Sequence, residues 1–183
     1  MKFTFSMFIL GLCASALFAQ GPVVRWNKIV GVITAPGVDS PAGGTVDSNN
    51  NVTNQIHSGT QPWTTKGGRA RVDLSTGEGS FDVEALVLNG GTASGTPGPI
   101  VSVVGTLVCN AGSNTATGAG AQAILDTPAV DLSSTGNAEL SFKLANVPSK
   151  CSTPLFLIRI PQFGLRWIAT GTQVSASSRS GNY

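Results

Sequence analysis

The chain has little charge of either sign. Lysine, arginine, aspartate and glutamate make up 11% of its 183 residues, against about 25% in an average soluble domain. Eleven Lys and Arg stand against nine Asp and Glu, so the formal net charge is +2, and no run of like charges occurs anywhere. The sequence therefore lacks the electrostatic footprint with which proteins bind nucleic acid or anionic membranes. We expect neither as a partner.

Histidine is nearly missing as well, since His57 is the only one. A hydrolase usually needs a histidine as general base beside its nucleophile, and the sequence has no G-x-S-x-G motif. His57 lies in the polar stretch 55–59, where a solvated loop residue is the simpler interpretation. A single histidine also excludes a histidine-rich zinc or copper site. We expect no enzyme, no bound metal and no cofactor.

Long apolar runs are confined to the N-terminus. A cationic start, a mostly apolar stretch at 3–12 and small residues up to Ala19 follow the three-part layout of a secretory signal peptide. The apolar stretch is shorter than the roughly 20 residues that a spanning helix needs, so we expect no transmembrane segment. We expect cleavage near Ala19, with Ala16 as the alternative, and a secreted or periplasmic protein. Lipid attachment at Cys13 is disfavoured because Leu12 replaces the usual small residue.

Cysteine is scarce. With Cys13 assigned to the signal peptide, Cys109 and Cys151 remain, and they allow one intramolecular pairing in an oxidising compartment, where disulfides persist. Neither cysteine belongs to a C-x-x-C motif, which disfavours a redox or metal role. We expect a disulfide between them that closes a loop of about 40 residues and contributes about 3–4 kcal/mol in the chain-entropy model. Two free buried thiols remain the alternative.

What the sequence has is glycine, proline and short alternating segments. It contains 23 glycines and 10 prolines, and period-2 patterns between turn residues replace any long helical stripe, which is typical of a sandwich or barrel. We therefore predict an all-β fold, a single antiparallel β-sandwich of Greek-key or jelly-roll type over residues 20–172, with a disordered tail at 173–183. Irregular stretches are expected at 36–54, 90–99 and 110–121. The predicted strands are 23–34, 70–74, 80–88, 101–109, 122–125, 130–132, 138–144, 155–160 and 165–170.

The candidate binding residue is a tryptophan in a polar loop. Trp63 lies among polar residues at 60–66, where its flat ring could stack on a sugar or anchor a partner. The alternative is a tryptophan that folds back over one end of the sandwich. If the loop binds carbohydrate, Gln61, Asn49 and Asn51 could supply hydrogen bonds.

Acidic residues suggest two further sites, both weaker. Asp82 and Glu84 share one strand face, as paired carboxylates of a glycosidase could. Cross-strand ion pairing with Arg69 and Arg71 is the simpler explanation. Residues 47–51 begin like a calcium-binding loop, but Val52 and Ser58 replace the Gly and Glu that such a loop needs at positions 6 and 12, so calcium binding there stays open.

These observations together predict an exported, non-enzymatic module that presents a binding or structural surface outside the cytoplasm, to an unidentified protein or polysaccharide. The alternative is a carbohydrate-binding module that uses Trp63.

Overall fold

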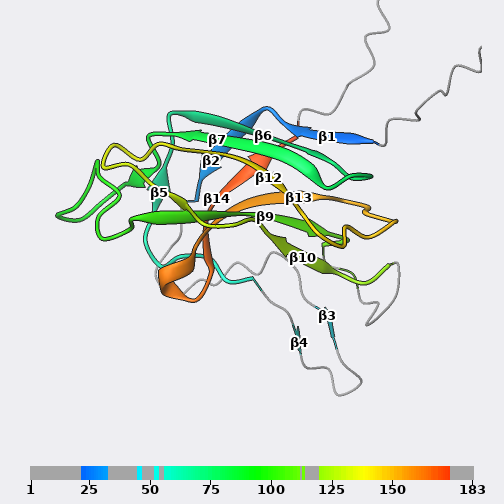
Figure 1. The fold of residues 1–183 in the computed structure, drawn as a ribbon. Helices are drawn as coiled ribbons and strands as arrows, with labels where there is room; N and C mark the ends of the chain where they lie inside the picture. The colour runs from blue at the N-terminus through cyan, green and yellow to red at the C-terminus, as the bar shows by residue number, and fades with distance from the viewer. Residues whose placement is uncertain are drawn as a thin grey trace, which may run out of the picture.

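The computed structural model describes residues 22–32, 45–46, 52–53, 56–111, 113 and 120–173 (Figure 1). The predicted signal peptide at 1–19, the possible calcium loop at 47–51 and the tail beyond Gln173 lie outside the described residues. Within the described residues every strand ladder is antiparallel, and the one helix is the short 3₁₀ turn η1 (Pro161–Phe163). The prediction of an antiparallel all-β protein is therefore confirmed.

The described strands form two larger and two small sheets. The four-stranded sheet has the order β1-β6-β7-β12, and the larger one runs β10-β9-β13-β14-β2 with β11 paired to β9. The pairs β3–β4 and β5–β8 make the small sheets. The strands are β1 (Val23–Trp26), β2 (Lys28–Gly31), β3 (Thr45–Val46), β4 (Val52–Thr53), β5 (Trp63–Thr64), β6 (Gly67–Asp73), β7 (Glu78–Glu84), β8 (Val87–Leu88), β9 (Ser102–Cys109), β10 (Ala123–Asp126), β11 (Val130–Asp131), β12 (Ala138–Lys143), β13 (Leu155–Ile160) and β14 (Arg166–Thr172).

The four-stranded sheet has one apolar and one polar face. In β12, Ala138 and Phe142 are buried, whereas Glu139, Ser141 and Lys143 are exposed. This alternation is what the sequence predicts for a strand with one wet face, because successive side chains point to opposite sides of a sheet.

The apolar faces of the two larger sheets contribute to one core cluster. Phe156 of β13 contacts rings of the other sheet, with centroids 5.4 Å from Trp26 and 5.6 Å from Phe81. Gly105 of β9 makes this packing possible, because a methyl carbon there would lie 2.8 Å from ring carbons of both Phe156 and Phe81. Tilted aromatic pairs of this kind contribute about 0.5–1.5 kcal/mol each beyond their buried area.

The larger sheet is covered on its second face as well. Ile56 packs there with Val108, Leu157 and Trp167 in a smaller apolar cluster. The chain next to Ile56 is fixed to β14, since the Trp167 amide donates to the His57 carbonyl at 2.9 Å. Strands β9 and β13 are consequently buried on both faces, and their sequences are nearly continuous apolar runs rather than alternating ones.

The first predicted strand is in fact two strands in two sheets. The stretch 23–34 is interrupted at Asn27, where β1 leaves the four-stranded sheet and the chain continues as β2 beside β14. Gly171 of β14 allows this joint, since a methyl carbon there would lie 2.7 Å from the Trp26 ring. The predicted strand 80–88 is likewise divided, because Ala85 has a φ of 48° and ends β7.

The other predicted strands overlap β6 and β9–β14, while three short strands were not predicted. Two of them, β3 and β4, lie in the stretch expected to be irregular, and β5 lies in the loop of Trp63. Residues 90–99, also expected to be irregular, contain no strand.

The predicted disulfide joins Cys109 at the end of β9 to Cys151, with Cα atoms 4.8 Å apart. Asn110 reinforces the same junction. Its Oδ1 accepts the Ser152 amide at 2.8 Å, and its Nδ2 donates to the carbonyls of Ala121 and Lys150 at 2.9 and 3.1 Å. The backbone ends around the disulfide are therefore held by a covalent bond and by one buried amide.

Candidate functional site

An apolar groove lies at one end of the described structure, between residues 59–63, 88–100 and 160–166. Its volume is about 490 Å³, which falls within the range of small-ligand sites. The apolar part is formed by Trp63, Leu88, Ile100, Ile160 and Phe163, and polar groups come from Thr60, Gln61, Thr92 and Arg166.

Non-local contacts place Trp63 in this groove. Its strand β5 pairs with β8, where Trp63 lies opposite Leu88, and its amide donates to the Val32 carbonyl at 2.7 Å. Gly31 leaves room for that approach, because a methyl carbon there would come within 2.4 Å of the Trp63 carbonyl oxygen.

Trp63 is only 3% exposed and belongs to the core cluster. It does not present a free ring face to solvent, so the tryptophan that folds back over one end is the alternative that agrees with the structure. Gln61 lies on the exposed side of the same groove. Asn49 and Asn51 lie outside the described residues, so only two of the four predicted binding residues are brought together here.

The exposed aromatic of the groove is Phe163, which sequence reasoning missed. It is 53% exposed and is the last residue of η1, which starts at Pro161 and is followed by Gly164 with a φ of 67°. The signal available in the sequence was this Pro-x-Phe-Gly turn, in which proline fixes the entry and glycine allows the left-handed exit.

The turn that carries Phe163 is anchored on both sides. Within it, the Gln162 side chain donates to the Ser102 hydroxyl at 2.7 Å. After it, the Leu165 carbonyl accepts a hydrogen bond from Nε of the buried Arg159 at 2.6 Å. Arg159 is itself fixed by Asp126, whose two carboxylate oxygens lie 3.0 and 3.2 Å from its Nη1. Phe163 is thus an exposed ring on a turn that hydrogen bonds hold at Gln162 and Leu165.

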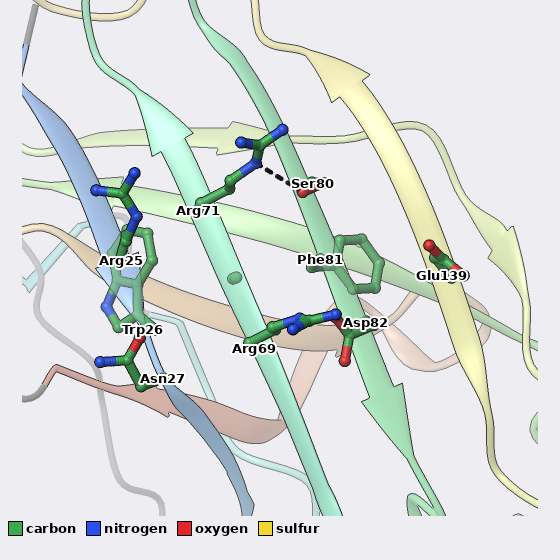
Figure 2. Close-up of a pocket in the computed structure, with 10 residues that line it drawn as sticks. Arg25, Trp26, Asn27, Arg69, Arg71, Ser80, Phe81, Asp82 and Glu139 are labelled. Carbon is green, nitrogen blue, oxygen red and sulfur yellow. Dashed lines mark hydrogen bonds and ion pairs between the residues drawn. The ribbon is translucent and has the colours of Figure 1, made fainter.

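A second candidate surface is the outer face of the four-stranded sheet (Figure 2). A shallow trough of about 360 Å³ runs there across β1, β6, β7 and β12. Arg69 is paired with Asp82 at 2.8 Å, and this hydrogen bond, together with the charge of Asp82, raises the pKa of the Arg69 guanidinium. The predicted cross-strand ion pairing is confirmed for Arg69, whereas Arg71 donates through Nε to the Ser80 hydroxyl at 3.2 Å instead.

The catalytic alternatives gain no support from their surroundings. Glu84 lies on the same face as Asp82, at the edge of a shallow, open part of the sheet surface. His57 is half-buried rather than solvated, because its segment is fixed to β14. Within the described ranges no three His, Cys, Asp or Glu side chains are grouped as a metal site would require. Among those same residues, no helix has the length and apolar character to cross a membrane.

No known protein family matches this chain, and no curated protein or solved structure matches it. Function is therefore inferred from the groove and the sheet face themselves.

Proposed function

We propose that this protein is an exported, non-enzymatic binding module, with its two larger sheets acting as a single sandwich that carries a ligand groove at one end. The signal-like residues 1–19 and the disulfide support export, because disulfides persist outside the reducing cytosol. The shared core cluster of the two sheets supports the sandwich.

The observation that carries this proposal is the exposed ring of Phe163 beside the buried apolar floor of Trp63, Leu88 and Ile100. A large apolar side chain that faces solvent on an anchored turn is poised to bury its surface against a ligand. Because Gln162 and Leu165 already hold the turn, binding loses little conformational entropy at this point.

The ligand that fits this groove best is a neutral saccharide segment. A sugar ring has an apolar C–H face, which packs against an aromatic ring such as Phe163, and a perimeter of hydroxyl groups. The exposed Thr60, Gln61 and Thr92 offer hydroxyl and amide groups at the rim, which can donate to and accept from such hydroxyls. The proposal thus keeps the predicted carbohydrate alternative but moves the stacking residue from Trp63 to Phe163.

A depletion assay tests this function. The purified protein is mixed with insoluble cellulose, chitin or peptidoglycan, and the protein left in the supernatant is measured. We expect depletion by at least one polymer, and we expect Phe163→Ala to abolish it. Val101→Ala is the matched control, because Val101 is also an exposed apolar residue but does not line the groove.

Four results would overturn parts of the proposal. Depletion that persists in Phe163→Ala, or no depletion by any polymer, would refute the proposal that the groove binds a saccharide. Capture of a host envelope protein that requires Phe163 would assign the groove to a protein partner instead. Enzymatic turnover that depends on His57, Asp82 or Glu84 would refute the non-enzymatic assignment.

A further inference from the structure

Two arginines from separate segments lie directly opposite each other on the outer face of the four-stranded sheet. Arg25 of β1 and Arg71 of β6 are register partners, and both are exposed. Figure 2 shows their side chains on the same side of the sheet, with both guanidinium groups directed toward the same end of the strands. Like charges placed directly across two antiparallel strands destabilise the pair.

Neither arginine has a carboxylate partner within the described part of the chain. The one hydrogen bond of this pair is from Arg71 Nε to the Ser80 hydroxyl, which leaves both terminal nitrogens of Arg71 and the whole guanidinium of Arg25 without a protein acceptor among those residues.

Three of the nearby carboxylates are engaged elsewhere, and Glu139, which lines the same trough, lies opposite Asp82 on β12. Asp82 pairs with Arg69 at 2.8 Å, and Glu78 lies 3.5 Å from Lys143. Asp73 accepts hydrogen bonds within its own turn from Ser75. Two positive charges therefore lie opposite each other, and neither is paired directly with a carboxylate of the described residues.

We propose that Arg25 and Arg71 together bind one doubly charged oxyanion, the phosphate group of a monoester or the free sulfate ion, on this face. Guanidinium groups bind such oxygens through paired, charge-assisted hydrogen bonds. A phosphate monoester carries about −1.5 to −2 charges at pH 7, which matches two guanidinium groups. Asn27 and Ser80, which line the same trough, add neutral hydrogen-bonding groups.

The surrounding charges restrict the ligand to a single anionic group. Asp82 and Glu139 lie on one side of the arginine pair, and Asp73 and Glu78 lie on the other, two residues away along the strands. An extended polyanion would meet these carboxylates, whereas one phosphate or sulfate group fits between them. This site shares no lining residue with the end groove, so the inference does not depend on the proposed function.

Titration calorimetry at constant ionic strength tests the proposal, with inorganic phosphate and sulfate as probes and chloride as the reference anion. We expect the parent protein to bind phosphate, and we expect Arg25→Gln and Arg71→Gln to weaken binding about tenfold or more, the loss expected for one charged hydrogen-bonding group. Arg69→Gln removes the same charge from the same trough but from a residue already paired with Asp82, so we expect a change below about twofold.

A second readout separates binding from folding. Without ligand, Arg25→Gln or Arg71→Gln relieves the like-charge contact, and we expect each to raise Tm by about 1–3 °C. The parent Tm rises with added phosphate, and this rise is lost in both variants. Glucose 6-phosphate and inorganic phosphate are compared as ligands. If the site recognises a phosphate ester on a larger ligand, glucose 6-phosphate binds more tightly; if it recognises a free anion, inorganic phosphate binds at least as tightly.

Two results would overturn the inference: an equal loss of binding in Arg69→Gln, which indicates diffuse attraction, or no phosphate-dependent heat or Tm shift in the parent. Phe163→Ala, measured in parallel, retains phosphate binding if the two sites are independent, so failure at one site is distinguished from failure at the other.

Discussion

The junction around the disulfide makes a sharp prediction for Asn110. This residue is 6% exposed and has a φ of 54°, a left-handed conformation that asparagine adopts more readily than most residues. Its side chain makes three hydrogen bonds to other described residues, one accepted from Ser152 and two donated to Ala121 and Lys150. Asn110→Ala removes all three and places a methyl group at a positive φ.

The magnitude follows from these contacts. A hydrogen bond contributes about 1 kcal/mol net to stability, so the three bonds contribute about 3 kcal/mol. A left-handed alanine adds a cost of about 1 kcal/mol. We therefore expect Asn110→Ala to lower the free energy of unfolding by about 4 kcal/mol and Asn110→Gly by about 3 kcal/mol, because glycine loses the same bonds without the conformational cost.

Urea unfolding monitored by tryptophan fluorescence, with the disulfide intact, measures both values. Asn110→Asp serves as a charge control, since it keeps one acceptor but turns a carboxylate oxygen toward two carbonyls. We expect this variant to be less stable at pH 7 than at a pH where the carboxylate is protonated. A loss below about 1 kcal/mol in Asn110→Gly would refute the view that this amide holds the junction.

Three further substitutions test the fold. Gly105→Ala drives a methyl group into two aromatic rings, so we expect it to lower the free energy of unfolding, measured by chemical denaturation, by about 1–3 kcal/mol. Gly67→Ala is the control and should be tolerated, because a methyl carbon added at this strand glycine would lie 3.9 Å from its nearest neighbouring atom. Equal effects of the two substitutions would contradict the packing. Ala85→Gly relieves a positive φ, and we expect it to stabilise the protein by about 0.5–1 kcal/mol; a lower Tm would show that the left-handed residue is not strained. Hydrogen bonds from Ser75 lower the pKa of Asp73 in the folded protein. The ionised Asp73 therefore stabilises the folded state above its unfolded pKa of about 3.9, and this contribution is lost as pH falls through the lower folded pKa. We expect Asp73→Asn to weaken the fall of the free energy of unfolding at acid pH, and an unchanged fall would assign the acid sensitivity to other groups.

Local patterns made the sheet faces predictable. The alternation in β12 and the turns on either side of it are encoded within a few residues, and two remaining cysteines allow a single pairing. The breaks at Asn27 and Ala85 could not be predicted in the same way. At both places the apolar pattern continues, but the chain leaves one ladder for another because of partners that are distant in sequence, such as β14 for β2.

The candidate sites also depend on contacts between distant parts of the sequence, which local patterns do not predict. Trp63 has polar neighbours along the chain, and its burial comes from Val32 and Leu88, which no local pattern connects to it. The sequence reveals that Arg71 alternates with buried residues on its strand, but only the pairing of β1 with β6 shows that Arg25 is its neighbour. A low overall charge therefore did not exclude a local pair of like charges.

The pairing of β2 with β14 also constrains the order of folding. As the chain emerges from the ribosome, β2 appears well before its partner β14, which is the last of the described strands, at residues 166–172. The edge of the larger sheet that β2 forms cannot be completed until β14 has been synthesised. Such sequence-distant pairing slows folding, and it leaves β2 without its ladder partner until residues 166–172 have been made.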